Sequence, residues 1–235
     1  EILVATPGRL LDHVESRNLL LNQVQILILD EADRMLDMGF MPDLKRILTL
    51  LPKQRQTLLF SATFSDDIKK LAHDFLVNPV TVEAERRNTA AENVKQSVLM
   101  VDQDNKFSVL ADLLRSRGLG SQALVFTRTK LTAARVARKL DREGIPADAI
   151  HGDKTQLERI KALDAFKEGK ITALVATDVA ARGLDIDQLP LVVNYELPTN
   201  AEDYVHRIGR TGRAGASCEA ISLVDGEEER RLVEI

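Results

Sequence analysis

Short apolar runs alternate with amphipathic segments along most of the chain. The apolar runs are mostly continuous, which is typical of strands that helices bury on both faces. The predicted strands are 2–5, 24–29, 57–61, 80–83, 97–101, 123–126, 148–150, 173–176, 191–194 and 220–224. The predicted helices are 7–16, 43–51, 66–76, 105–117, 130–143 and 155–168. This alternation with short connections predicts an α/β fold built on parallel sheets.

A polar segment without a clear period, 83–96 (EAERRNTAAENVKQ), separates two such strand–helix series. We therefore predict a first domain at 1–84, a linker at 85–95 and a second domain at 96–235. The chain opens directly on a strand pattern and stops inside a helical one, so we expect a fragment whose first domain is incomplete and less well packed.

Composition narrows the class of protein. The chain is 44% hydrophobic and 29% charged with a net charge of -4, which argues against a purely electrostatic nucleic-acid binder but allows a local basic track. A single cysteine excludes an internal disulfide framework and suits a reducing compartment. No apolar run approaches the roughly 18–20 residues that cross a bilayer, so we expect a cytoplasmic protein without a membrane partner.

Three carboxylates lie in the segment 30–33 (DEAD), directly after an apolar run. Ligand-binding groups of open α/β sheets lie at the carboxyl ends of strands. A carboxylate there can hold a hydrated Mg²⁺ beside phosphates, and a neighbouring Glu can activate an attacking water. The alternative is an acidic first turn of a helix, which the helix dipole favours. These four residues alone do not decide between the two.

Two other polar segments follow or end apolar runs. The hydroxyls of 61–63 (SAT) can bond a carboxylate, but Ser and Thr at a strand end more often make a turn or a helix cap. The segment 176–185 (ATDVAARGLD) carries two Asp and one Arg on one strand exit.

Arginine and glycine alternate in 206–213 (HRIGRTGR). Glycine lets the backbone approach a ligand closely, and arginine forks fit phosphoryl oxygens. A solvated basic loop is the alternative, and the regular alternation with Gly favours a functional site. In 6–9 (TPGR), Thr6 suits an N-cap and Pro7 a first helical turn, whose free N–H groups can bind an RNA phosphate. Alone, this segment indicates only a well-formed helix start.

Read together, TPGR, DEAD, SAT, ATDVAARGLD and HRIGRTGR resemble the ordered motifs of DEAD-box ATP-dependent RNA helicases, and HGD at 151–153 fits the same series. The resemblance covers essentially the whole chain, and the combination is specific although each motif alone is not. The wording DEADRMLDMGF and LFSATFSDDI is most similar to the bacterial RhlE-type branch. The resemblance implies two RecA-like α/β domains in tandem, with ATP between them and RNA running across both.

The resemblance also implies a set of catalytic and nucleotide-binding residues. They are Asp30, Glu31, Asp33, Ser61, Thr63, Gly183, Asp185, His206, Arg210 and Arg213. Asp30 would hold Mg²⁺ through water, and Glu31 would activate the hydrolytic water. Asp33 would couple to the SAT hydroxyls and to the histidine of HRIGRTGR. The last two arginines of that motif would reach the γ-phosphate, Asp185 would touch the ribose, and Arg207 would brace the loop internally.

The implied RNA contacts lie in both domains. They are Thr6, Pro7, Gly8, Arg9, Arg128, Gly152, Asp153, Gln156, Arg159, Thr177 and Arg182. With 4% aromatic residues and no Trp, the chain has few platforms for stacking bases. We therefore expect it to hold the RNA backbone without reading sequence.

The expected function is RNA-stimulated ATP hydrolysis coupled to local duplex unwinding or remodelling of RNA–protein complexes. The expected protein acts as a monomer, with ribosome-assembly or RNA-decay proteins as possible partners. ATP and RNA would each favour a closed arrangement of the domains, and hydrolysis would release the RNA.

One departure from the family is plain: no Walker A loop, GxxxxGK[ST], occurs in the chain. We expect that an N-terminal part is missing and that these residues alone have no ATPase activity. Two alternatives stay open. A non-catalytic RNA-binding module would bind RNA without ATP, and a related DNA translocase would prefer DNA in a competition assay.

Overall fold

In the computed structural model, the chain forms two compact units, Glu1–Glu83 and Ala84–Ile235. The structure describes residues 1–61, 64–83, 94–118, 121–181, 184, 186, 189–211 and 219–235. The division between the units lies one residue from the predicted end of the first domain. Most of the predicted linker, 85–95, lies outside the described residues, and a strand already begins at Lys95.

The first unit is a small α/β arrangement. Its elements are α1 (Pro7–Glu15), β1 (Ile26–Leu29), α2 (Ala32–Asp37), α3 (Met41–Leu50), β2 (Gln56–Leu59) and α4 (Asp66–Phe75). β1 and β2 pair in parallel, from Ile26 opposite Gln56 to Leu29 opposite Leu59. The parallel register places both strand exits at the same edge.

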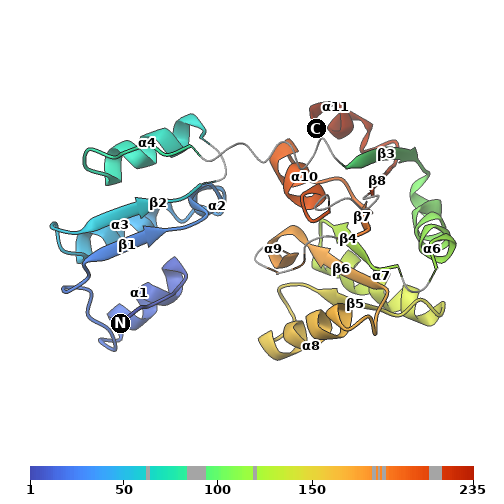
Figure 1. The fold of residues 1–235 in the computed structure, drawn as a ribbon, viewed down its shortest axis with the longest axis horizontal. Coiled ribbons are helices and arrows are strands. Elements are labelled where there is room, and N and C mark those ends of the chain that lie inside the picture. Colours follow the sequence, from blue (N-terminus) through green and yellow to red (C-terminus); the bar gives the residue numbers. More distant parts are fainter. Residues whose placement is uncertain are drawn as a thin grey trace. The chain divides into compact units, whose positions relative to one another are not determined.

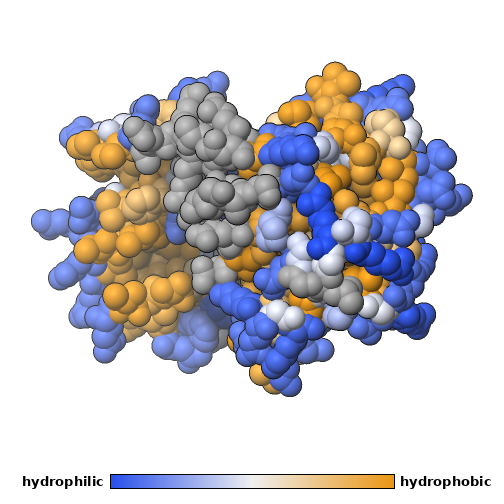
Figure 2. Space-filling model, turned by 45° about the vertical axis from the view of Figure 1, so that its right-hand side comes forward, coloured by the Kyte–Doolittle hydropathy of each residue, from blue (hydrophilic) through white to orange (hydrophobic). Residues whose placement is uncertain are grey.

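Packing in the first unit is modest. One cluster joins Leu11 of α1 to Ile47 of α3, and another joins Ala32 of α2 to Ile68 and Leu71 of α4. On β1, however, Ile26 is 56% exposed and Ile28 57%. Exposed apolar side chains of this kind appear as orange surface in Figure 2. The expectation that strands are buried on both faces is therefore wrong for β1.

Two predicted strands are not formed. Residues 2–5 and 80–83 have no strand assignment, and Ile2 and Val80 are 95% and 87% exposed. A β-rich run becomes a strand only where a neighbour supplies a ladder of hydrogen bonds. Neither range pairs with another strand in the described part of the chain, so the pattern alone overestimated the strand content.

The second unit carries a larger sheet. Its elements are β3 (Lys95–Met100), η1 (Gln103–Asn105), α6 (Lys106–Ser116), β4 (Ala123–Thr127), α7 (Lys130–Arg142), β5 (Ala147–Ile150), α8 (Gln156–Lys167), β6 (Ala173–Thr177), α9 (Asp178–Ala181), β7 (Leu191–Asn194), α10 (Ala201–Ile208), β8 (Glu219–Val224) and α11 (Glu229–Glu234). The six strands lie in the order β3-β8-β7-β4-β6-β5, and every pair is parallel. The predicted parallel α/β fold is confirmed.

Helices cover both faces of this sheet (Figure 1). Alternate residues of a strand point to opposite faces. On β4, Val125 belongs to a cluster with α6 and α7, whereas Leu124 and Phe126 belong to one with α8 and α9. β4, β6 and β7 are buried throughout, as their continuous apolar runs predicted. The edge strand β3 differs, because Val98 is 43% exposed and Met100 56%.

The strand order reverses beside β4. From β4 the chain proceeds to β5 and β6 on one side, and then to β7 and β8 on the other. Because all strands are parallel, the residues that follow β4, β5, β6 and β7 lie at one edge of the sheet. In open α/β sheets this edge, at such a reversal, is where ligands bind.

One buried charged cluster fixes the C-terminal part of the second unit. Lys106, the first residue of α6, is 1% exposed, and its Nζ lies 2.8 Å from Asp225 Oδ2 and also contacts the Glu228 carboxylate. Glu228 Oε1 in turn accepts the main-chain N–H of Leu197 at 2.9 Å. Burying ions costs several kcal/mol unless they are paired, so this cluster depends on all of its members.

We predict that Lys106→Met destabilises the second unit by about 3–5 kcal/mol, because two buried carboxylates lose their cation. Urea unfolding followed by circular dichroism measures this. Lys161→Met, on the exposed surface of α8, is the control and should stay within about 0.5 kcal/mol of wild type. Equal stability of the two variants would contradict the assigned importance of the cluster.

The same cluster predicts a pH dependence. Burial alone would raise the pKa of Asp225, but the Lys106 ammonium and the N–H groups of Glu227 and Glu228 lower it below its ordinary value. The stabilisation by the charged carboxylate is therefore present above the unfolded pKa, about 3.9, and is lost as the pH falls through the lowered folded pKa. Asparagine cannot ionise.

The stability difference between wild type and Asp225→Asn should therefore be largest near neutral pH and shrink below about pH 4. Urea unfolding across this pH range measures it. Asp112→Asn, an exposed carboxylate on α6, should stay within about 0.5 kcal/mol of wild type at neutral pH. A difference for Asp225→Asn that does not change with pH would refute the prediction.

Candidate nucleotide and RNA site

The DEAD segment lies at the exit of β1. Asp30 follows the strand, and its carboxylate accepts the N–H of Glu31 at 2.9 Å. Ala32, fully buried, donates its N–H to the carbonyl of Phe60 at 3.0 Å, and Phe60 donates back to Leu29 at 2.8 Å. The exits of β1 and β2 are thus tied together, which brings the DEAD segment beside the end of β2, where the SAT segment begins at Ser61.

Glu31 has a strained backbone. Its φ and ψ are both 50°, in the left-handed region that a residue with a Cβ adopts at a cost of about 1–2 kcal/mol. The strand must turn here directly into α2, whose first residue is anchored to Phe60. The Glu31 carboxylate is exposed and accepts from Arg34 Nη1 at 2.9 Å. Strain of this kind clusters at functional sites, and the sequence carries no sign of it.

The expected coupling joins Asp33 to the SAT hydroxyls and to His206. Asp33 is half-buried in the first turn of α2, and the Ser61 hydroxyl is buried without a hydrogen-bond partner among the described residues. Thr63 lies outside the described residues. His206, in α10, lies 3.7 Å from Glu202 on its own helix.

The TPGR segment begins a helix as predicted. Thr6 occupies the N-cap of α1 with an extended backbone, and Pro7 opens the helix. The Thr6 side chain makes no capping hydrogen bond, so it does not satisfy the free N–H groups of the first turn. A Cβ at Gly8 would meet nothing within 4 Å, and Arg9 is exposed with a 3.7 Å contact to Asp12. The predicted RNA contacts at the start of α1 are therefore open to a ligand.

The predicted RNA contacts of the second unit gather at the carboxyl edge of the large sheet. Arg128 follows β4, residues 152 and 153 follow β5, and Thr177 ends β6. Asp153 accepts from Lys130 Nζ at 2.8 Å, and Thr177 is 9% exposed. Residues from three strands that lie far apart in the sequence are thus brought to one edge.

The helix α8 presents two more of these residues. A capping box holds its start, since Thr155 accepts from the Glu158 N–H and Glu158 accepts from the Thr155 N–H and hydroxyl. These hydrogen bonds lower the pKa of Glu158 below its ordinary value. Gln156 Oε1 lies 3.4 Å from Arg159 Nη1, and Arg159 Nη2 lies 3.4 Å from the Ala180 carbonyl. Arg159 therefore faces the end of α9.

Arg207 is the most heavily bonded side chain of the site. It is 1% exposed, and its Nε and Nη2 form a fork on the Asp178 carboxylate at 2.6 and 2.8 Å. Its Nη1 donates to Asn194 Oδ1 at 2.9 Å and to the Glu196 carbonyl at 2.7 Å. The guanidinium also lies 4.9 Å from the centre of the Phe126 ring. It thus ties α10 to the exits of β6 and β7. The expected internal brace of the HRIGRTGR loop stays a prediction.

Arg210 is the predicted nucleotide-binding residue of the second unit with a described contact. Arg210 donates from Nη1 to the Leu184 carbonyl at 3.0 Å. Arg182, Gly183, Asp185 and Arg213 lie outside the described residues, and their predicted functions stay predictions.

Some residues of this edge were not predicted. Asn194 and Glu196 both bond Arg207, and Glu196 Oε2 also accepts the N–H of Arg128 at 2.7 Å. The available signal was their position directly at the end of the apolar run 191–194, the same signal that singled out the other strand exits.

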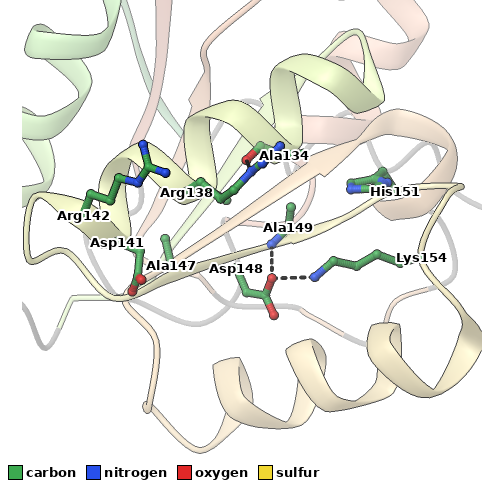
Figure 3. Close-up of a pocket in the computed structure, with 10 residues that line it drawn as sticks. Ala134, Arg138, Asp141, Arg142, Ala147, Asp148, Ala149, His151 and Lys154 are labelled. Carbon is green, nitrogen blue, oxygen red and sulfur yellow. Dashed lines mark hydrogen bonds and ion pairs between the residues drawn. The ribbon is translucent and has the colours of Figure 1, made fainter.

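A groove runs along the outermost strand, between α7 and β5 (Figure 3). It is lined on one side by Arg138 and Arg142 and on the other by Asp148 and Lys154. The Asp148 carboxylate accepts the N–H of Ala149 at 2.7 Å and pairs with Lys154 at 2.5 Å. The carboxylate thus occupies a main-chain donor of an edge strand, which protects the edge against pairing with another strand.

Two family models match the chain. The model described as DEAD/DEAH box helicase matches residues 1–71, and the model described as helicase conserved C-terminal domain matches residues 105–215. The fold and the site therefore define a helicase core of this class.

Relatives are similar over nearly the whole chain. The ATP-dependent RNA helicase DbpA of Bacillus subtilis is 45% identical over 100% of this chain and 49% of its own length. The helicase RhlB of Pseudomonas syringae is 46% identical over 99% of this chain and 59% of its own. The chain thus spans about half the length of these relatives. It belongs to the DEAD-box ATP-dependent RNA helicase family. The RhlE-type branch stays a prediction.

Solved structures are similar as well. Dbp5 of S. cerevisiae bound to RNA and ADP BeF3 has a TM-score of 0.85 and is 37% identical, with coverage of 99% of this chain and 61% of Dbp5. A DEAD box protein from Methanococcus jannaschii has a TM-score of 0.58 and is 42% identical, with coverage of 99% and 62%.

Two further features are absent from the described residues. They contain no group of three or more His, Cys, Asp or Glu side chains placed to hold a metal ion. They also contain no helix with the length and apolar character that spanning a bilayer requires.

We predict that Arg207→Lys destabilises the second unit by about 2–3 kcal/mol, because an ammonium cannot form the fork on Asp178 and also reach the two acceptors at Asn194 and Glu196. Thermal or urea unfolding measures the loss. Arg138→Lys, on the exposed side of α7, is the matched control and should have little effect. A loss under about 0.5 kcal/mol for Arg207→Lys would show that the fork is not needed.

Proposed function

We propose that these residues act in an ATP-dependent RNA helicase that couples RNA-stimulated ATP hydrolysis to local duplex separation or remodelling of RNA–protein complexes. The observation that carries the proposal is the DEAD segment. Its two exposed carboxylates leave the exit of β1 beside the exit of β2, and the second of them has a strained backbone. Family membership supports the same function.

In this proposal the first unit supplies the acidic groups. Asp30 would hold Mg²⁺ through its water shell, and Glu31 would orient and deprotonate the attacking water. The donor set fits, because carboxylate oxygens are the ligands that Mg²⁺ prefers and the ion usually keeps several waters beside phosphates. Bound Mg²⁺ would neutralise charge on the phosphates during transfer. Asp33 and Ser61 transmit the state of the nucleotide.

The second unit supplies arginines in the same proposal. Arg210 and Arg213 act on the γ-phosphate, where guanidinium groups stabilise the charge of the transition state. The buried Arg207 holds α10, the helix that precedes both arginines in the chain. Asp185 and Gly183 complete the nucleotide contacts.

RNA is held by its backbone in this proposal. The first turn of α1 offers N–H groups together with Arg9, and the carboxyl edge of the large sheet offers Arg128, Thr177 and the start of α8. Contacts of this kind position the strand without reading its sequence. The structure of Dbp5 was determined with RNA and ADP BeF3, which supports the same two ligands here. We further propose that the protein acts as a monomer in the cytoplasm. Its proposed partners are proteins that act on the same RNA, in ribosome assembly or RNA decay.

A non-catalytic RNA-binding module is the second candidate. The observation that favours it is that Arg128, Asp153 and Thr177 come to one edge of the sheet within the second unit alone. It predicts that these residues bind RNA usefully and independently of ATP.

We predict that Glu31→Gln lowers the rate of ATP hydrolysis at least about 100-fold, because loss of a general base typically costs two to four orders of magnitude. The variant is tested in a helicase that contains this chain together with a Walker A loop, called here the complete helicase. RNA affinity with a non-hydrolysable ATP analogue should be retained. The measurements are steady-state phosphate release and fluorescence anisotropy of labelled RNA.

Asp37→Asn, an exposed carboxylate at the end of the same helix, is the control and should keep full turnover. Loss of RNA binding in Glu31→Gln, or retained turnover, would contradict the function assigned to Glu31. RNA affinity that does not respond to ATP in the unmodified complete helicase would favour the non-catalytic module.

A further inference from the structure

The loop after β7 lies beside one proposed RNA contact, Arg128, and is linked through Arg207 to the segment of a second, Thr177. Residue 196 is a glutamate whose side chain is 13% exposed, at the carboxyl edge of the sheet. Arg128 follows the neighbouring strand β4, and the Thr177–Asp178 exit of β6 lies one strand further on the same side. None of the sequence motifs contains Glu196, and its function follows only from its contacts.

The first contact is with Arg128. Glu196 Oε2 accepts the main-chain N–H of Arg128 at 2.7 Å, and Oε1 lies 3.9 Å from Arg128 Nη2. One carboxylate thus holds the backbone from which the arginine extends and lies near its guanidinium, which Glu228 Oε1 also approaches, at 4.0 Å. The Arg128 side chain itself is 37% exposed, so it stays accessible to a ligand.

The second contact is with the buried guanidinium of Arg207. The main-chain carbonyl of Glu196 accepts from Arg207 Nη1 at 2.7 Å, and the same guanidinium grips Asp178, the residue after Thr177. A displacement of residue 196 therefore affects both Arg128 and the segment that carries Thr177.

The loop is also held from behind. Tyr195 and Glu196 donate their N–H groups to the Phe126 carbonyl at 3.0 and 3.3 Å. Leu197 donates to the buried Glu228, which Lys106 pairs. Because its backbone is held at three consecutive residues, Glu196 cannot readily move with the side chain that it contacts.

We propose that Glu196 is a positioning residue for RNA: it holds Arg128 in the orientation that contacts the RNA backbone. This inference rests on the proposed function, in which Arg128 is an RNA contact. Glu196 itself does not touch RNA, since a carboxylate would repel the phosphates. The effect of its carboxylate on RNA affinity therefore passes through Arg128, whereas its main-chain carbonyl, which Arg207 bonds, is unchanged by a side-chain substitution.

The test is a double-mutant cycle on RNA affinity in the complete helicase with a non-hydrolysable ATP analogue. The probe is a labelled oligouridine of about ten nucleotides. Arg128→Ala should weaken binding about tenfold and lower the magnitude of the salt slope by about 0.7, the value for one phosphate contact on a single strand. Glu196→Met should give a similar loss, and in the Arg128→Ala background it should add nothing.

Two further variants separate positioning from a general structural effect. Glu196→Gln keeps an oxygen that accepts the Arg128 N–H and should restore most of the affinity. Glu143→Met, which removes an exposed carboxylate paired with Arg115 at 2.9 Å, should leave affinity and salt slope unchanged. Amide hydrogen exchange of the wild-type protein should also show protection at Arg128 before RNA is added, a measurement that does not depend on how the variants fold.

The outcomes distinguish two failures. If Arg128→Ala binds RNA like wild type, the RNA contact assigned to Arg128 in the proposed function is wrong, and the inference falls with it. If Arg128→Ala weakens binding but Glu196→Met has no effect, or has the same effect in both backgrounds, only the positioning function of Glu196 is overturned. An unprotected Arg128 amide would overturn it as well.

Discussion

The second unit depends on one buried guanidinium. Arg207 connects α10 to the exit of β6 through Asp178, to the end of β7 through Asn194 and to the following loop through the Glu196 carbonyl, and it lies over Phe126 of β4. Removing such a charge from water costs several kcal/mol, and full hydrogen bonding must offset this. The arrangement is therefore stable only when all the partners are in place, which ties the strand exits at this edge into one geometry.

The same physical device recurs behind the loop. Lys106 is buried between Asp225 and Glu228, and Glu228 holds the main-chain N–H of Leu197. Neither buried cation can contact a ligand. Each fixes a polypeptide segment that carries more exposed polar groups, such as Arg128 and Arg210. The buried charges thus fix the positions of the strand exits at the carboxyl edge of the sheet. The more exposed charges remain accessible to a ligand.

The first unit uses backbone geometry for the same purpose. Two hydrogen bonds tie the exits of β1 and β2, and Ala32 is buried against α4. The short turn that remains forces Glu31 into the left-handed region. The strain is tolerated because the residues on either side are anchored, and it keeps two carboxylates exposed at the strand exit. A flexible loop with the same residues would not hold them in one arrangement.

The sequence by itself determined the α/β class, most helices, the parallel strands of the second unit and the candidate residues at strand exits, because apolar periodicity and short polar motifs are local properties. It predicted strands at 2–5 and 80–83 that are not formed, since a strand also needs a neighbour. It did not reveal the strain at Glu31 or the contacts of Asn194 and Glu196. Only the tertiary structure decided these, because they depend on which strand exits are adjacent, and adjacency in a parallel sheet follows the strand order rather than the order of the chain.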